Sequence, residues 1–195
     1  MNLANKITLS RVCLIPVMVA LLYGPGLWAK IGGVFVFTIA ALSDLVDGKI
    51  ARKRGEVTDL GAVMDPVADK VLVLSAFAVL VERGVVPAYL MILVLAREIA
   101  ISGVRIVAAS KGVVIAASSA GKTKTAWQIT AVAFGLLSLI LAETSTSAWG
   151  GSEIYPWLRW HIPYATAAVA ALLSFTSGVS YFKAAWPVLD PGTRK

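Results

Sequence analysis

The sequence predicts an all-α integral membrane protein with about six transmembrane helices, and its composition and apolar segments support this fold class. Hydrophobic residues make up 58% of the 195 residues and charged residues 15%, against roughly 25% charged residues in soluble domains. The mean hydropathy is +0.79. Apolar stretches approaching the length of about 20 residues that a membrane-spanning helix needs recur along the chain. This composition excludes disordered, collagen-like and disulfide-rich secreted proteins.

Six apolar segments are the candidate spans, and turn-forming or polar residues separate them. In chain order they are residues 12–23, 31–45, 67–81, 85–109, 125–141 and 161–182. Residues 1–10 are expected to form a short surface helix that leads into the first span. Turn or loop signals lie between spans at Gly24-Pro25-Gly26, at Arg83-Gly84 and in the Ser/Thr/Gly-rich residues 144–152. Because no repeat or linker divides the chain, residues 1–195 are expected to form a single membrane-embedded domain.

The distribution of lysine and arginine orients these helices, because cytoplasmic loops carry an excess of both. With six spans the termini share one side, which holds Lys6, Arg11, Lys49, Arg52, Lys53, Arg54, Lys111, Lys122, Lys124, Lys183, Arg194 and Lys195. The opposite loops hold Lys30, Arg83 and Arg159. We therefore expect a multi-pass protein of the cytoplasmic membrane with both termini in the cytoplasm. In such a protein the net charge of +7 favours anionic lipid or an anionic substrate as the partner over nucleic acid.

Four carboxylates lie at the cytoplasmic ends of the second and third spans. Asp44 and Asp47 are three residues apart, and Asp65 and Asp69 are four apart, so each pair lies on one face of its own helix. Two antiparallel helices joined by a short loop can bring the pairs together. Four negative charges in a poorly hydrated region stay ionised only if cations neutralise them. Hard oxygen ligands suit Mg²⁺ or Mn²⁺, and this ligand count fits a site for two ions.

Two other interpretations of these acids remain open. Asp65 precedes Pro66 and is also typical of a helix N-cap, although this does not explain Asp69, which lies one turn deeper in an apolar helix. A cation or proton transporter would use the acids as an ion pathway. Transporters commonly show paired halves, whereas the second half of this chain has no counterpart to the acidic segment.

The acidic segment resembles the signature of a known family. The run Asp44-x2-Asp47-Gly48-x2-Ala51-Arg52-x8-Gly61-x3-Asp65-x3-Asp69 is similar to that of the CDP-alcohol phosphatidyltransferases. The resemblance implies a homodimeric membrane enzyme with a cavity open to the cytosol, which moves a phosphatidyl group from CDP-diacylglycerol to an alcohol and releases CMP. It further implies that the four aspartates hold the metal ions and that Asp69 is also the general base. By the same resemblance, the nucleotide site is formed by Gly48, Arg52, Thr58 and Gly61.

The N-terminal segment resembles one branch of this family. Asn5-x2-Thr8-x2-Arg11 is similar to an element of the members that use sn-glycerol 3-phosphate, where it would flank the head group of CDP-diacylglycerol. On the residues alone, a surface helix with an interfacial arginine explains the pattern equally well.

The fourth and fifth spans carry further basic residues that bear on the acceptor alcohol. Arg97 and Glu98 lie inside the fourth span, with Arg105 two turns further on. Arg97 and Glu98 could simply neutralise one another inside the span, but adjacent helical residues point about 100° apart, so the two are expected to be poorly placed for direct pairing. Together with Lys122 and Lys124, this pattern resembles the glycerol 3-phosphate branch, and implies that Arg97, Arg105, Lys122 and Lys124 hold the acceptor phosphate. Flanking cytoplasmic lysines are the simpler alternative, and serine or inositol phosphate are the alternative acceptors.

Overall fold

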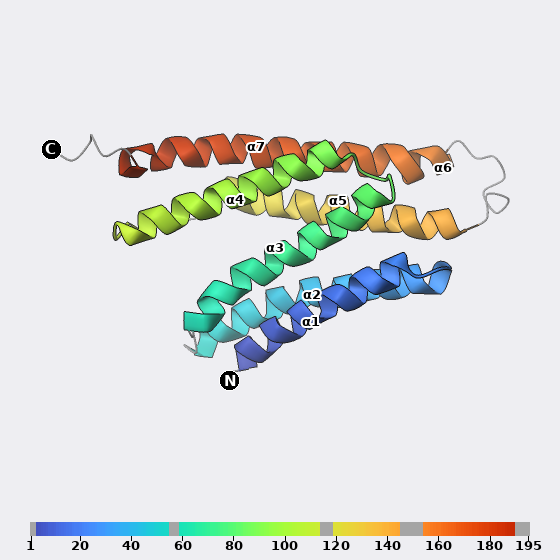
Figure 1. Cartoon of the computed structure of the whole chain (residues 1–195), viewed down its shortest axis with the longest axis horizontal. Helices are drawn as coiled ribbons and strands as arrows, with labels where there is room; N and C mark the ends of the chain where they lie inside the picture. Colours follow the sequence, from blue (N-terminus) through green and yellow to red (C-terminus); the bar gives the residue numbers. More distant parts are fainter. Residues whose placement is uncertain (1–2, 55–58, 114–118, 145–153, 190–195) are drawn as a thin grey trace.

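Helices joined by short turns make up the residues that the computed structural model describes, 3–54, 59–113, 119–144 and 154–189 (Figure 1). Side chains are described for residues 8–43, 67–113, 123–144 and 154–186. No strand occurs in these ranges. The predicted all-α fold class is confirmed for the described residues.

Within the described residues, six long helices correspond to the six predicted spans. They are α1 (Leu3–Tyr23), α2 (Leu27–Arg54), α3 (Asp59–Glu82), α4 (Ala88–Ser110), α5 (Ser119–Glu143) and α7 (Ile162–Leu189). A short helix α6 (Ile154–Pro156) and a π-helical turn (Trp157–His161) lead into α7. The fourth helix begins later than its predicted span because the extended backbone of Pro87, with φ −64° and ψ 140°, forms the N-cap.

The prediction of a separate surface helix at the N-terminus is wrong for the described residues. Residues 3–10 form the first turns of α1, which continues without interruption to Tyr23. No glycine or proline lies between Leu3 and Val12, so nothing in the sequence stops the helix before it enters the apolar segment.

The turns fall where glycine and proline predict them. Gly84 follows α3 with φ +69°, a conformation that glycine adopts without strain and that ends the helix. Gly26 adopts φ +81° just before α2. The predicted loop over residues 144–152 lies, apart from Thr144, outside the described residues.

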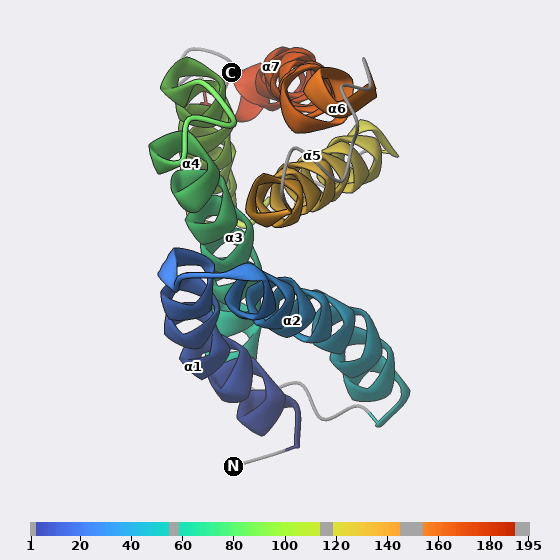
Figure 2. The same cartoon turned by 90° about the vertical axis from the view of Figure 1, so that its right-hand side faces the viewer.

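Two groups of helices meet along α3. Helices α1 and α2 pack on each other, and α4 and α5 each pack on α7. Figure 1 shows α3 crossing between the groups, and Figure 2 shows it between the α1–α2 pair and the α4–α5–α7 group. A large hydrophobic core cluster joins them and includes Met18, Leu22, Phe37, Leu72, Phe77, Leu80, Val94, Leu136 and Ala170, and a smaller cluster lies between α4 and α7. Helices α3 and α5 pack closely at Gly135 of α5, where an added Cβ would clash with the side chain of Leu80 of α3.

The outer surface is strongly apolar. Among the described residues, the stretches Thr123–Glu143 and Ile154–Trp186 are long and apolar enough to cross a membrane, and Thr8–Tyr23 and Leu27–Ser43 are shorter apolar helices. Large apolar side chains project outward, including Phe35, Ile92, Ile99, Ile106, Leu172 and Phe175. A surface of this kind is consistent with a location in the membrane, where lipid covers it.

Charged residues at the end of the bundle that holds the α3–α4 turn are paired within the protein. Lys30 is buried at the start of α2, with its Nζ 3.5 Å from Glu143 Oε1 at the end of α5. Arg83 Nη2 donates to the carbonyl oxygen of Tyr23 at 3.1 Å, and Arg159 Nη1 donates to Ser138 Oγ at 2.6 Å. These contacts fasten the helix ends together on the side that the sequence predicts to be extracytoplasmic.

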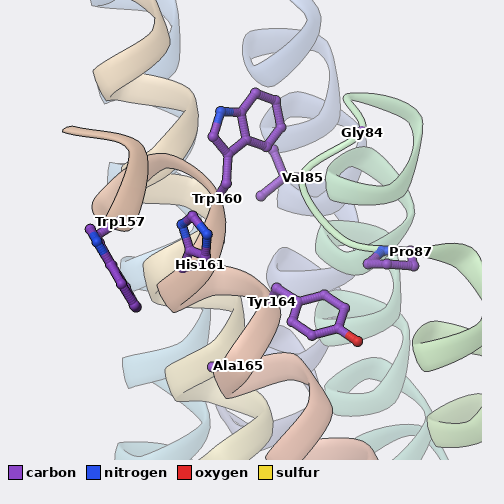
Figure 3. A pocket seen from close by; sticks show the side chains of 8 residues that line it. All are labelled: Gly84, Val85, Pro87, Trp157, Trp160, His161, Tyr164 and Ala165. Atoms are coloured by element: carbon purple, nitrogen blue, oxygen red, sulfur yellow. The ribbon is translucent and has the colours of Figure 1, made fainter. Parts of the chain in front are cut away.

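A cavity of about 460 Å³ lies at this same end. It is formed by the α3–α4 turn, the π-helical turn and the start of α7. Figure 3 shows Trp160 beside Val85 and the Tyr164 ring directed toward Pro87, whereas Trp157 points away from both. Tryptophan and tyrosine are typical of the interface between a membrane and water, so the cavity fits a position at that interface.

Candidate active site

Four cationic side chains from α3, α4 and α5 lie near one another. Lys70 is within electrostatic range of Arg97, Arg105 and the carboxylate of Asp69. Lys124 is within electrostatic range of Arg97, Lys70 and Asp69. We call Lys70, Arg97, Arg105 and Lys124 the cation cluster. Three of its members were predicted as acceptor-phosphate residues, and the structure brings these three together.

Glu98 of α4 is a buried carboxylate inside the cation cluster, only 8% exposed. Its Oε1 forms an ion pair with Lys124 Nζ, and accepts hydrogen bonds from Arg97 Nη1 at 3.2 Å and Gln128 Nε2 at 3.4 Å. Gln128 Nε2 also donates to Ser174 Oγ at 3.2 Å. Glu98 therefore joins α4 to α5 directly and to α7 through Gln128.

The expectation that Arg97 and Glu98 do not pair is wrong. Their Cα–Cβ bonds diverge, but the long arginine side chain carries Nη1 back to within 3.2 Å of its neighbour's carboxylate. The Nη2 atom of the same guanidinium donates to Ser177 Oγ of α7 at 2.9 Å. Angular spacing on a helix thus fails as a guide for a side chain of this length.

The other two cations are held by hydroxyl groups. Arg105 Nε donates to the Tyr181 hydroxyl at 3.1 Å, and its guanidinium carbon lies 5.3 Å from the centre of that ring. Lys70 Nζ donates to Ser102 Oγ, which in turn donates to the carbonyl oxygen of Glu98 at 2.7 Å. Hydroxyls orient these cations without neutralising them, so their positive charge stays available to an anion.

The acidic motif lies on the predicted helices. Asp44 and Asp47 lie on the last turns of α2, and Asp65 and Asp69 on the first half of α3, so the backbone gives each pair the predicted helical spacing. The end of α2 and the start of α3 lie at the same end of the bundle as the end of α4 and the start of α5 (Figure 1). Asp69 is partly buried.

The metal site itself stays a prediction. The side chains of Asp44, Asp47 and Asp65 are outside the described residues, and no group of three His, Cys, Asp or Glu gathers among the side chains that are described. The donor set nevertheless fits a divalent ion, because four carboxylates on the adjoining ends of two helices offer the hard oxygen ligands that Mg²⁺ and Mn²⁺ prefer.

The remaining predicted site residues that the structure describes are distributed over four helices, α1, α2, α3 and α5. Thr8 and Arg11 of α1 are buried, 2% and 1% exposed. Those placed by their backbone alone are Asn5 on α1, Gly48 and Arg52 on α2, Gly61 on α3 and Lys122 on α5. Thr58 lies outside the described residues.

Comparison of the sequence with known proteins identifies a family that covers most of the chain. The family model for CDP-alcohol phosphatidyltransferase matches residues 1–177. The chain belongs to this family.

Two curated relatives of this phosphatidyltransferase match nearly its whole length, and a third matches about 72% of it. It is 37% identical over 202 aligned residues to the CDP-diacylglycerol–glycerol-3-phosphate 3-phosphatidyltransferase of Bacillus subtilis (strain 168), covering 96% of this chain and 97% of the relative. The protein of the same name from Rickettsia bellii (strain RML369-C) is 36% identical, covering 94% of each chain. A probable phosphatidylglycerophosphate synthase of Mycobacterium tuberculosis (strain ATCC 25618 / H37Rv) is 41% identical, covering 72% of this chain and 68% of the relative.

Sequence reasoning missed several residues around the cation cluster of this phosphatidyltransferase. Lys70 directly follows Asp69 in an apolar helix. Its charge could have marked it as a candidate functional residue, because ionisable residues inside membrane spans usually have a function. Gln128 lies one turn after Lys124 and shares its helix face. Ser174, Ser177 and Tyr181 recur at helical spacing on α7, a polar stripe that the apolar composition of the segment concealed.

Proposed function

We propose that this phosphatidyltransferase transfers the phosphatidyl group of CDP-diacylglycerol to sn-glycerol 3-phosphate, giving phosphatidylglycerol phosphate and CMP. The observation that carries the proposal is the cation cluster beside Asp69. A phosphate monoester dianion needs several cations around it, whereas a neutral acceptor such as serine does not. The names of the two relatives that cover nearly the whole chain support the same acceptor.

The chemistry is a single in-line displacement. The primary hydroxyl oxygen of sn-glycerol 3-phosphate forms a bond to the phosphorus that carries diacylglycerol, and the bond between that phosphorus and the CMP oxygen breaks. The Asp69 carboxylate takes the hydroxyl proton, and CMP leaves with the bonding electron pair. Arg97, Arg105, Lys122 and Lys124 are proposed to hold the acceptor phosphate. Lys70, which adjoins Asp69, joins this set and helps to bring the hydroxyl to the base.

The nucleotide half of the site is assigned to the acidic motif and its surroundings. Asp44, Asp47, Asp65 and Asp69 are proposed to hold two Mg²⁺ or Mn²⁺ ions, which would neutralise the pyrophosphate and the departing CMP. The CDP-lipid is proposed to be bound by Asn5, Thr8, Arg11, Gly48, Arg52, Thr58 and Gly61. Glycines let a nucleotide approach the backbone, and an arginine meets a phosphate with paired donors.

The proposed setting is the cytoplasmic membrane. Residues 1–195 form one domain whose six long helices cross the bilayer, with the termini and the active site on the cytoplasmic side, and two copies form a homodimer. The apolar outer surface and the bias of lysine and arginine toward one side support this arrangement.

A panel of acceptors tests the proposed function directly. Purified protein in lipid is supplied with CDP-diacylglycerol, Mg²⁺ and one of sn-glycerol 3-phosphate, inositol phosphate, serine or glycerol, and CMP release and the lipid product are measured. We expect product with sn-glycerol 3-phosphate alone. Transfer to inositol phosphate or serine would assign the same chemistry to another acceptor, and ion flux without CMP release would contradict a transferase.

Replacing Arg105 by methionine tests the assignment of the cation cluster to the acceptor. We expect KM for sn-glycerol 3-phosphate to rise by about tenfold or more, because a charge-assisted hydrogen bond contributes about 1.5–3 kcal/mol. KM for CDP-diacylglycerol should change by less than about twofold. Lys111→Met is the matched control, since it removes one positive charge from the exposed end of the same helix. Equal changes in both KM values would contradict the assignment.

A further inference from the structure

We propose that Glu98 is the positioning residue for Lys124 in the acceptor pocket. The inference rests on the proposed function and deepens it: Glu98 does not touch the substrate, but its carboxylate fixes the ammonium that binds the acceptor phosphate.

The geometry of Lys124 shows why it needs such a partner. Its side chain is a flexible four-carbon chain that ends in a compact positive charge. The residue is buried, with only 5% of its surface exposed. The ion pair with Glu98 Oε1 engages one of the three ammonium N–H groups. Because an ammonium carries three N–H donors, this one ion pair does not exhaust its capacity to donate to a phosphate. A lysine already held in place loses less conformational freedom on binding the phosphate than a free one does.

Glu98 is itself held from several sides. Arg97 Nη1 and Gln128 Nε2 donate to its Oε1, and Gln128 is tied in turn to Ser174 of α7. The carboxylate is therefore a fixed point between α4 and α5 rather than a mobile surface group. Arg97 does not depend on it to the same degree, because Ser177 accepts a second hydrogen bond from the Arg97 guanidinium.

The positive charges around Lys124 make the Glu98 carboxylate important even before substrate binds. Lys124 faces the like charges of Arg97 and Lys70. Without Glu98 its ammonium would be buried beside these two cations with Asp69 of α3 as the carboxylate still in range, and burial beside like charges favours loss of the proton or movement out of the site. Either outcome removes a phosphate ligand.

A double-mutant cycle tests the proposal. Glu98→Gln keeps the side-chain volume and removes the charge, and Lys124→Met removes the ammonium. We expect each single variant to raise KM for sn-glycerol 3-phosphate by about tenfold, with kcat and KM for CDP-diacylglycerol within about threefold of wild type. If Glu98 acts through Lys124, Glu98→Gln should add less than about twofold in the Lys124→Met background.

A binding measurement without turnover accompanies the cycle. The rise in melting temperature that sn-glycerol 3-phosphate produces in the detergent-solubilised protein should shrink in Glu98→Gln and Lys124→Met alike. Glu143→Gln is the matched control, because it removes the carboxylate of another lysine pair, with Lys30, at the opposite end of the bundle. This control should leave KM and the ligand-induced shift unchanged.

The outcomes separate a positioning role from a purely structural one. Additive effects in the double variant, an unchanged KM in Glu98→Gln, or a loss confined to kcat and unliganded stability would each overturn the proposal. If Glu98→Gln does not fold, Glu98→Asp retains the charge but withdraws it by one methylene, and should raise the same KM by about threefold only while Lys124 is present. Failure of the proposed function is distinguishable, because the wild-type protein would then show no transfer to sn-glycerol 3-phosphate.

Discussion

Replacing Asp69 by asparagine is expected to reduce kcat by about a thousandfold or more, because the variant loses both the general base and one metal-binding carboxylate. KM for sn-glycerol 3-phosphate should stay within about threefold of wild type, since the cation cluster that binds the acceptor phosphate is intact. Steady-state kinetics with CDP-diacylglycerol at saturation measures both quantities.

The matched control for this variant is Glu82→Gln, which removes a carboxylate from the far end of the same helix, where Glu82 accepts a hydrogen bond from Tyr23. It should leave kcat unchanged. Equal losses of rate and of acceptor affinity in Asp69→Asn would place Asp69 in substrate binding and argue against its role as the base.

Removal of divalent metal is expected to stop the reaction. Dialysis against EDTA should lower CMP release by about a hundredfold or more, because the negative pyrophosphate and the departing CMP would then face the acidic motif without neutralising cations. Addition of Mg²⁺ or Mn²⁺ should restore the activity.

A variant lacking the motif provides the control for chelation. Asp44→Asn with Asp47→Asn should show little activity at any metal concentration, which separates metal bound at the motif from metal carried in by the nucleotide. Turnover that continues unchanged in EDTA would contradict the two-ion site and with it the proposed role of the four aspartates.

The helices of this protein were predictable because the bilayer imposes their length and composition. Each apolar segment had to form a helix, and glycine and proline mark the turns, as Gly84 does after α3. The boundaries were less predictable. The N-terminal residues looked polar enough for a separate surface helix, yet continuity of helix-forming residues from Leu3 onward joins them to α1.

The candidate site was predictable to the extent that its residues are charged. Arg97 and Arg105 stood out in apolar surroundings and Lys124 in the basic run before the fifth span, and the structure brings the three together. The partners that hold them were not predictable, because a serine or glutamine at helical spacing carries no distinctive signal until the packing of α4, α5 and α7 is known. The pairing of Arg97 with Glu98 depends on the reach of a side chain rather than on the position of its Cα.

Because the two groups of helices meet along α3, the proposed acceptor site and the proposed nucleotide site lie largely on different helices. The proposed nucleotide residues belong mainly to α1, α2 and the start of α3, whereas most of the cation cluster belongs to α4 and α5, braced by α7. Asp69 and Lys70 are adjacent residues of α3, so this one helix contributes to both the proposed nucleotide site and the proposed acceptor site. On this assignment, substitutions in α4, α5 and α7 would alter which alcohol is accepted and would leave the residues proposed to bind CDP-diacylglycerol unchanged.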